Sequence, residues 1–473
     1  MSRWHRFWAW LDERLGWSTS ILPIIEHPVP RNVNWWYVLG SATLVAFIVQ
    51  VVTGVALAFA YVPAPNSAYS SLNWITHDEV LGHVVRGIHY WGASAMVILI
   101  FAHVIRVFLF GSYKFPRELN WLTGVFLLFL TLGMAFTGQL LRWDQDAYWA
   151  VAVGGEMAGR TPFIGKELSH ILFAGQTIGG PTLTRFYATH VFLLPALMFL
   201  LIGAHLYLVV RHGISDPPEA GVVVDTKTER KRYHDLIARE GIPFWPDAAW
   251  RDVIFALAVG SVVLILAVFV GPKELGKLAD PTIIKANPRP DWYFLWYFAL
   301  LALMPPAIEN YFIIGFPLLV AIVFLILPFI APTGERSWKR RPWAVGIVVV
   351  SLVSIAVLVR EGQVAPWSPN FNPKPIPAQI TQPLTGDATR GAQLFSDSGC
   401  HNCHTIDGTG GSRGPNLTTV GNRLSVNELT WRILNGGTNM PAFADTLSPS
   451  DVHALVDFLS SLKGSSGSTA KGP

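Results

Sequence analysis

Residues 86–105 read RGIHYWGASAMVILIFAHVI. This stretch is long and apolar enough to cross about 30 Å of hydrocarbon as a helix, yet it contains two histidines, which are costly to bury in lipid without a partner. His89 and His103 are 14 residues apart. That spacing is close to four turns of 3.6 residues, so the two share one helix face about 21 Å from each other. The stretch therefore predicts a membrane-spanning helix with one buried histidine near each membrane surface.

A second apolar stretch, FYATHVFLLPALMFLLIGAHLYLVV at residues 186–210, repeats the pattern with His190 and His205 at a spacing of 15. The chain has 14 histidines, and these four are the ones well inside the expected spans. Both helices cross in the same direction, so His89 faces His190 near the outer surface and His103 faces His205 near the inner one. Two b-type haems with two histidine ligands each follow from this arrangement. The alternative is histidines that bond to neighbouring helices or relay protons, which two matched pairs at helical spacing disfavour.

Four glycines follow the same period. Gly40 and Gly54 are 14 residues apart on one expected helix, and Gly124 and Gly138 are 14 apart on another. A glycine at each haem level lets a flat macrocycle approach the backbone closely. Close helix packing through small residues is the alternative, and the shared period favours the cofactor.

Three arginines lie close in sequence to the histidines: Arg86, Arg106 and Arg185. A guanidinium binds a carboxylate through parallel hydrogen bonds, so we expect these side chains to pair with haem propionates. The alternative is that they mark the membrane boundary.

Composition extends the membrane assignment to most of the chain. Residues are 51% hydrophobic and only 14% charged, against about 25% charged in soluble domains. Seven uncharged stretches predict an all-α bundle of seven membrane helices at 35–62, 87–105, 121–141, 186–210, 253–272, 311–332 and 342–359. Residues 292–308 are also apolar, but they are short and end in Pro305-Pro306, so we interpret them as a re-entrant or surface helix. Seven crossings place the two termini on opposite sides of the lipid bilayer.

Positive charges predict the orientation. Lysines and arginines gather before the first span and in alternate loops, the pattern of the cytoplasmic side: Arg3, Arg6, Arg14, Arg106, Lys114, Arg117, Arg211, Lys227, Arg230, Lys231, Arg232, Arg239, Arg336, Lys339, Arg340 and Arg341. The loop with Lys273, Lys277, Lys285 and Arg289 is an exception. The net charge of +4 thus reflects topology, and no nucleic-acid partner is expected. Residues 1–30 are expected to lie along the membrane surface, because Trp4, Phe7, Trp8, Leu11 and Leu15 recur at helical spacing.

A soluble unit follows the last span. Residues 361–384 contain six prolines and predict a semi-rigid linker, 385–463 a small helical domain, and 464–473 a flexible tail. The domain contains Cys400-His-Asn-Cys403-His404, the attachment signature of a covalent c haem. A disulfide or half of a zinc site would be the alternatives. Met440 is the expected second iron ligand, with His453 as its rival.

Three segments resemble cytochrome b of the cytochrome bc and chloroplast-type complexes: Arg86-Gly-Ile-His-Tyr-Trp-Gly-Ala, Thr137-Gly-Gln-Leu-Leu-Arg-Trp-Asp-Gln-Asp-Ala-Tyr-Trp-Ala and Leu183-Thr-Arg-Phe-Tyr-Ala-Thr-His. The resemblance covers about residues 30–360. It divides the membrane part into a di-haem core, residues 31–215, and a three-helix part, residues 216–360, which are separate chains in the chloroplast-type form. The C-terminal domain is similar to class I cytochrome c in Gly391-Ala-Gln-Leu-Phe, Gly414-Pro-Asn-Leu and Met440-Pro.

The resemblance implies quinone sites. Pro290-Asp-Trp-Tyr293 matches the quinol-oxidation motif, in which Asp291 and Tyr293 would help to receive quinol protons. Asp291 stands where most members have Glu, which favours a low-potential menaquinol. Asp252 would belong to the inner quinone site, with Arg211 and His212 as weaker candidates. The chloroplast-type form attaches an extra haem to a cysteine where this chain has Val38, so no covalent third membrane haem is expected.

The implied function is a quinol:cytochrome c-type oxidoreductase working by a Q-cycle. Quinol would be oxidised at an outer site, and electrons would pass through both b haems to an inner quinone site, with the c haem on the high-potential branch. Expected partners are a separate Rieske iron–sulfur subunit, other small membrane subunits and a soluble or membrane-bound electron acceptor, in a dimeric complex. The expected location is the bacterial inner membrane, with a cytoplasmic N-terminus and the c domain outside. Two other functions remain open: a di-haem b anchor for a dehydrogenase or hydrogenase, and a tethered electron carrier with vestigial quinone sites.

Overall fold

The computed structural model describes residues 2–175, 177–280, 289–364, 374–411, 414–436, 440, 442–444 and 446–463, without the side chains of residues 20, 21, 306 and 307. The expected flexible tail at 464–473, residues 365–373 of the expected linker at 361–384, and Lys285 lie outside the described residues.

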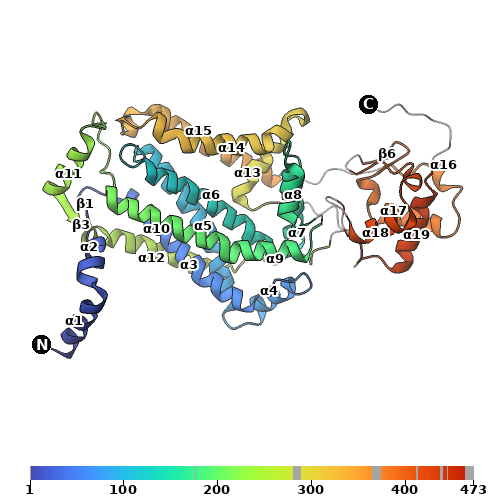
Figure 1. The fold of residues 1–473 in the computed structure, drawn as a ribbon, viewed down its shortest axis with the longest axis horizontal. Helices are drawn as coiled ribbons and strands as arrows, with labels where there is room; N and C mark the ends of the chain where they lie inside the picture. The colour runs from blue at the N-terminus through green and yellow to red at the C-terminus, as the bar shows by residue number, and fades with distance from the viewer. Residues whose placement is uncertain are drawn as a thin grey trace.

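Seven helices in the described part of the chain are long and apolar enough to cross a membrane. They are α3 (Leu39–Ala60), α5 (Gly82–Leu109), α6 (Glu118–Leu140), the continuous unit Gly180–His212 that contains α9 and α10, α12 (Trp250–Phe269), α14 (Pro306–Ile330) and α15 (Pro342–Val364). Figure 1 shows them gathered lengthwise in one bundle. The prediction of an all-α, seven-helix membrane part is confirmed.

The short apolar segment is a separate helix, α13 (Trp292–Ala302), packed against α15. It ends three residues earlier than Pro305, and Pro306 begins α14 instead. Proline suits the first helical turn, where the backbone N–H that it lacks has no intrahelical partner. The sequence therefore predicted the existence of the short helix correctly, and its end too late.

The helical unit Gly180–His212 contains an irregular turn at the level of His190. α9 (Gly180–Ala188) passes into one π-helical turn, Thr189–Leu193, before α10 (Leu194–His212). Pro195 cannot donate the N–H that would bond to the carbonyl of Val191 four residues earlier. The backbone hydrogen bonds of this turn span five residues instead of four, and the turn carries His190.

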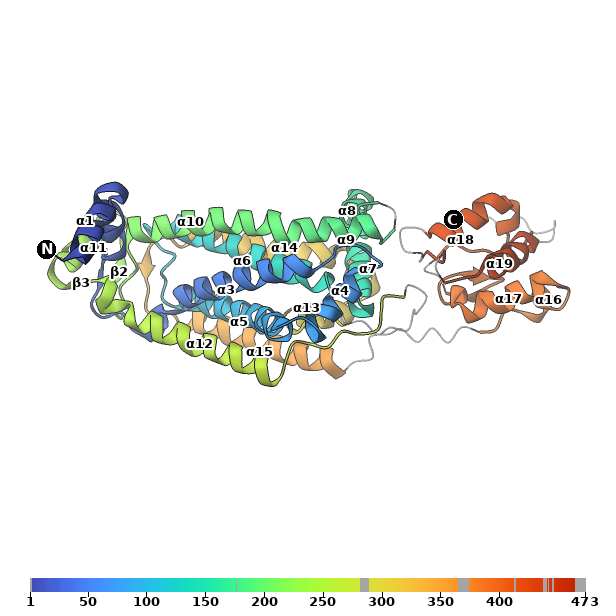
Figure 2. The ribbon, with the colours of Figure 1, turned by 90° about the horizontal axis from the view of Figure 1, so that it is seen from below.

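The two ends of the bundle differ. The basic end carries α1 (Arg3–Leu15), α2 (Leu22–Ile25), α11 (Glu229–Glu240) and the pair of β1 (Pro28–Pro30) with antiparallel β3 (Gly241–Pro243). A second pair there joins β2 (Val223–Val224) to β4 (Gly334–Glu335). The opposite, distal end carries α4 (Ala68–His77), α7 (Gln145–Gly159) and α8 (Gly165–Phe173). Figures 1 and 2 both place the C-terminal unit beyond the distal end and the N-terminus at the basic end.

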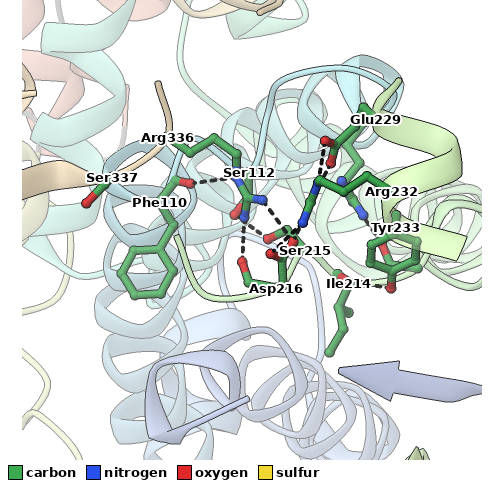
Figure 3. A network of polar contacts seen from close by, with 12 residues as sticks. Phe110, Ser112, Ile214, Ser215, Asp216, Glu229, Arg232, Tyr233, Arg336 and Ser337 are labelled. Carbon is green, nitrogen blue, oxygen red and sulfur yellow. Dashed lines mark hydrogen bonds and ion pairs between the residues drawn. The ribbon is translucent and has the colours of Figure 1, made fainter. Parts of the chain in front are cut away.

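A buried ionic network ties the basic end together (Figure 3). We call Asp216, Glu229, Arg232 and Arg336 the basic-end network. Asp216 accepts hydrogen bonds from Arg336 at 2.9 Å and from Arg232 at 3.0 Å, and Arg232 also donates to Glu229 at 2.8 Å. Burial alone would raise the pKa of Asp216, but the two guanidinium groups lower it to about 2. The network joins the segment after α10 to the segment before α15.

The C-terminal unit has its own core. α17 (Asp387–Asp397), α18 (Val426–Asn435) and α19 (Pro449–Ser461) enclose apolar side chains that include Phe395 and Phe458. Gly391 lets α17 cross α19 closely, since a Cβ there would lie 1.9 Å from the Ala454 carbonyl oxygen. α16 (Ala378–Thr381) precedes this core, and β5 (Thr405–Ile406) pairs with β6 (Thr409–Gly410) within it.

Candidate functional site

Two cavities inside the bundle each contain one of the expected histidine pairs. The distal cavity, about 270 Å³, is lined by His89 and His190, and the basic-end cavity, about 590 Å³, is lined by His103 and His205. A layer of side chains common to both walls separates them: Phe47, Met96, Thr131 and Met198. The rings of His89 and His190 have centroids 6.4 Å apart. The cavities are therefore stacked along the bundle as the two spacings in the sequence predict.

Threonines hold three of the four histidine rings. Thr53 bonds to Nδ1 of His89 at 2.9 Å, Thr123 to Nδ1 of His205 at 2.9 Å and Thr137 to Nδ1 of His190 at 3.0 Å. Each of these threonine hydroxyls also donates to a carbonyl oxygen of its own helix. Its oxygen must therefore accept the Nδ1–H, which leaves Nε2 as the nitrogen for a metal. Nδ1 of His103 is buried and makes no hydrogen bond with the described residues.

Each of the four periodic glycines faces one of the four histidines. A Cβ added at Gly138 would lie 2.6 Å from His190, and one at Gly40 would lie 3.1 Å from His103. The corresponding values are 3.2 Å from Gly54 to His89 and 3.5 Å from Gly124 to His205. These glycines leave the histidine rings room to stand upright beside the backbone, as a planar group held between two imidazoles requires. The donor set and the space both fit b-type haem.

The distal cavity also contains the expected acidic motif. Asp291 and Tyr293 line it together with the outer histidine pair, and the Tyr293 hydroxyl donates to Asp291 Oδ2 at 2.8 Å. Burial and the neighbouring carboxylate raise the pKa of Tyr293. The tyrosine therefore keeps its proton and is the hydrogen-bond donor in this pair, with the Asp291 carboxylate as the acceptor.

The basic-end cavity contains Asp252 but not the two weaker candidates. Asp252 lines it and accepts a hydrogen bond from the Ser41 hydroxyl, which comes from α3. Arg211 is exposed at the end of α10, and neither Arg211 nor His212 is among the residues that line the cavity in the described part of the chain. The structure brings Asp252 to the inner histidine pair and leaves Arg211 and His212 outside.

The three arginines expected near the haems are placed differently. Arg106 lines the basic-end cavity, donates to the Trp36 carbonyl oxygen at 3.0 Å and lies over the Tyr37 ring at 4.2 Å. Arg86 lines the distal cavity. Arg185 is exposed, donates to the Ile171 carbonyl oxygen at 2.5 Å and does not line either of these two cavities.

The cysteine motif lies in a short turn at Cys400–Asn402, against the core of the C-terminal unit. No disulfide joins Cys400 to Cys403 in the described part of the chain. Nδ1 of His404 bonds to the Pro415 carbonyl oxygen at 2.9 Å, so Nε2 is left for a metal. Burial lowers the pKa of His404 and keeps the ring in its neutral, metal-binding form.

The two rival sixth ligands lie in different surroundings. Met440 is partly buried against the apolar core of the C-terminal unit. His453 is on α19 with a 67% exposed side chain, and it lies 3.5 Å from Asp387 and 3.6 Å from Asp457. The partly buried thioether is the better placed of the two for a haem that is shielded from water.

Sequence reasoning missed the threonines, and a signal for them exists. Thr53, Thr123 and Thr137 each stand directly before one of the periodic glycines, whereas Leu39 precedes Gly40. It also missed Ser41, for which the sequence offers no periodic signal.

Comparisons with known proteins agree with this geometry. Residues 24–213 match the family model described as cytochrome b/b6/petB, residues 278–376 match cytochrome b(C-terminal)/b6/petD, and residues 386–459 match cytochrome C oxidase, cbb3-type, subunit III. The C-terminal match fits a c-type domain joined to a cytochrome b.

Similar proteins include the cytochrome b6 of Heliobacterium mobile, 45% identical over 44% of this chain and 99% of that protein. The menaquinol:cytochrome c reductase cytochrome b subunit of Bacillus subtilis is 41% identical over 45% of this chain and 99% of its own length. The cytochrome b of Allochromatium vinosum is 33% identical over 74% of this chain and 87% of its own length. Among solved structures, a chain of a hyperthermophilic respiratory Complex III aligns with a TM-score of 0.66 and 27% identity, covering 76% of this chain and 91% of that one.

Proposed function

This chain belongs to the cytochrome b family and carries a cytochrome c domain at its C-terminus, and from that premise we propose that it oxidises quinol at the distal cavity and reduces quinone at the basic-end cavity. It is an integral membrane subunit of a quinol:cytochrome c reductase-type complex. The observation that carries the proposal is the presence of Asp291, Tyr293, His89 and His190 around one cavity.

The family implies b haems and the C-terminal domain implies a c haem. We assign one b haem to His89 and His190, and the other to His103 and His205. Cys400 and Cys403 would bind the c haem covalently, with His404 and Met440 as iron ligands. When bound, these groups would supply one-electron transfer, the b haems between the two cavities and the c haem within the C-terminal domain.

Asp291 is the proton acceptor in this proposal. Tyr293 donates to its Oδ2, so Oδ1 would accept the hydrogen bond of a quinol hydroxyl and then its proton. A general base must lie within hydrogen-bond reach of the proton that it removes, and the apolar wall of the distal cavity would hold the quinone ring beside this carboxylate. Tyr293 orients the carboxylate through its hydrogen bond.

Asp252 would have the opposite task in the basic-end cavity. Its carboxyl group would deliver protons to a reduced quinone, and the Ser41 hydroxyl bonded to it would fix its orientation. The proposal makes no use of Arg211 or His212, because they do not line the cavity.

We further propose the Q-cycle topology and its partners. The basic end would face the cytoplasm of a bacterium by the excess of positive charge there, so the c domain and the distal cavity would face the outside of the inner membrane. A separate Rieske subunit would take one electron from quinol, in a dimeric complex that includes other small membrane subunits and passes electrons to a further acceptor. The shorter Asp291 favours menaquinol as the substrate.

The test is quinol-driven reduction of an external c-type acceptor by the purified complex. Asp291→Asn should slow this reaction about 10²-fold, the loss typical of removing a general base, while all three haems keep their spectra. Asp78→Asn, at an exposed carboxylate between α4 and α5, serves as the control and should leave the rate unchanged. An unchanged rate in Asp291→Asn would rule out the assigned role of this carboxylate.

The same assay separates the two rival functions. A di-haem anchor for a dehydrogenase or hydrogenase has no need of the Asp291–Tyr293 pair, so it predicts no effect of Asp291→Asn on its partner's reaction. A tethered carrier predicts reduction of the c haem without any requirement for quinol or an iron–sulfur subunit.

A further inference from the structure

Arg142 lines the distal cavity with a side chain that is 12% exposed, and it has no role in the site described above. It lies in the turn between α6 and α7, whose backbone is fixed on both sides. The Tyr61 hydroxyl donates to the Leu141 carbonyl oxygen at 2.7 Å, and Trp143, with a positive φ of 52°, is 6% exposed. The turn directs the Arg142 side chain to the cavity lined by His89 and His190.

Two nitrogen atoms of this guanidinium lack a hydrogen-bond partner. Nε and Nη2 of Arg142 are buried and make no hydrogen bond with any described residue. The nearest carboxylates are those of Asp144, 3.6 Å away, and Asp146, 3.9 Å away. Asp144 already accepts the N–H groups of Ala147 at 2.9 Å and Gly276 at 3.0 Å. Buried donors on a charged group are normally satisfied, so the contents of the cavity are expected to supply the acceptor.

Arg86 also lines the distal cavity, but its guanidinium is less available to bind an acceptor there. Its Nη1 donates to Thr76 at 3.0 Å, and its Nη2 donates to the Lys273 carbonyl oxygen at 2.7 Å. Both ends of that guanidinium are occupied by the protein. Arg142 instead presents Nε and Nη2, which form one edge of the guanidinium and match the two oxygens of a carboxylate.

We propose that Arg142 binds a propionate of the outer b haem and that its fixed positive charge raises the reduction potential of that haem. The inference rests on the proposed function, because it requires a haem between His89 and His190. Reduction adds a negative charge to the haem, and a nearby cation in a site of low dielectric stabilises the reduced form. A higher potential at this haem makes it a better acceptor of an electron from quinol in the same cavity.

Redox titration of the two b haems in the purified complex tests the proposal. Arg142→Gln should lower the potential of the outer haem by the equivalent of about a tenfold change in its reduction equilibrium, about 59 mV for one electron, while the inner haem stays unchanged. Arg142→Lys keeps the charge and should retain most of the wild-type potential. Arg160→Gln is the matched control, since Arg160 pairs with Glu156 and Glu309 and does not line the cavity.

An outer-haem potential that is unchanged in Arg142→Gln, or that falls equally in Arg142→Lys, would overturn the proposal. If the complex with Arg142→Gln fails to assemble, the test is the redox-difference infrared spectrum of the Arg142→Lys complex, compared with that of the wild type. The propionate bands of the outer haem should shift when the two-donor edge of the guanidinium is replaced by the single ammonium group of lysine. Unchanged bands would overturn the proposed contact. A complex without two b haems would instead contradict the proposed function, so the two failures are distinguishable.

Discussion

At the scale of single residues, three threonines determine which nitrogen each histidine presents. Thr137 accepts the Nδ1–H of His190 because its own hydroxyl proton is donated to the Gly133 carbonyl oxygen at 2.8 Å. The same arrangement at Thr53 and Thr123 fixes His89 and His205. Partners of this kind orient metal ligands and increase their basicity.

Thr137→Val should therefore weaken retention of the outer b haem. We expect a loss of about 10- to 100-fold in haem affinity, as for other partners of metal ligands, with the inner haem unaffected. Thr131→Val is the control, because Thr131 bonds only to the Leu127 carbonyl oxygen of its own helix, at 2.9 Å. Haem content after graded detergent washing measures the effect, and equal loss from both variants would contradict the role assigned to Thr137.

A second prediction at this scale concerns the c haem. Met440→His should preserve the covalent haem, since Cys400, Cys403 and His404 remain, and should lower its reduction potential, because thioether ligation raises it. His453→Ala should leave the potential unchanged. Redox titration of both variants decides, and the opposite pair of results would make His453 the ligand.

The sequence identified those site residues that repeat at helical spacing, and it could not identify the others. The four histidines and four glycines repeat at helical spacing, and the structure places them together around two cavities. Ser41 and Asp252 are 211 residues apart, and their contact depends on how α3 packs against α12. No local pattern encodes such a pairing, nor the direction in which the turn at Trp143 sends Arg142.

At the scale of elements, the basic-end network joins segments that follow α10 and precede α15. Asp216 lies between Arg232 and Arg336, whose side chain is only 5% exposed. Removing one partner of a buried ion pair leaves the other charge unpaired in a medium that solvates it poorly. The network is thus positioned to stabilise the junction between the segment that follows α10 and the segment that precedes α15.

Asp216→Asn should lower the stability of the complex by about 3–5 kcal/mol, the cost of breaking a buried pair. Glu13→Gln, which removes an exposed pair with Arg14 on α1, should have almost no effect. Thermal unfolding of the purified complex measures both. Equal melting temperatures for Asp216→Asn and the wild type would show that the network does not stabilise this junction.

The pH dependence of this network has a defined sign. The pKa of Asp216 is lowered to about 2 from about 3.9 in an unfolded chain. Its stabilising contribution is therefore fully present above about pH 4 and is lost as the pH falls through about 2. Wild-type melting temperatures should approach those of Asp216→Asn over this acidic range.

The starts of several membrane helices could not be predicted from hydrophobicity. The hydrophobic runs predicted seven spans, and the structure extends several of them through polar turns that hydropathy does not include: α5 begins at Gly82 rather than at residue 87, and α9 begins at Gly180 rather than at 186. These first turns are stabilised by contacts with the rest of the protein at the distal end, such as the bond from Thr182 to the Phe173 carbonyl oxygen.

At the scale of the whole molecule, an odd number of spanning helices places the two ends of the chain at opposite ends of the bundle. Because α13 does not add an eighth crossing, the last helix ends at the distal end, and Arg289 bonds there to the Gln363 carbonyl oxygen at 2.7 Å. The C-terminal domain therefore follows at the same end as Asp291 and the outer histidine pair (Figure 1). In the proposed function this keeps quinol oxidation and the c haem on one side of the membrane.

In the proposed function, one chain holds two b haems between matched histidine pairs and one covalent c haem. Pyridine haemochrome spectra of the purified chain test it most directly, together with haem staining of a denaturing gel. We expect a b-to-c ratio of two to one and staining of this chain itself, because only the c haem would be bound covalently. A ratio of one to one would contradict the assignment of His89, His103, His190 and His205 as ligands of two haems.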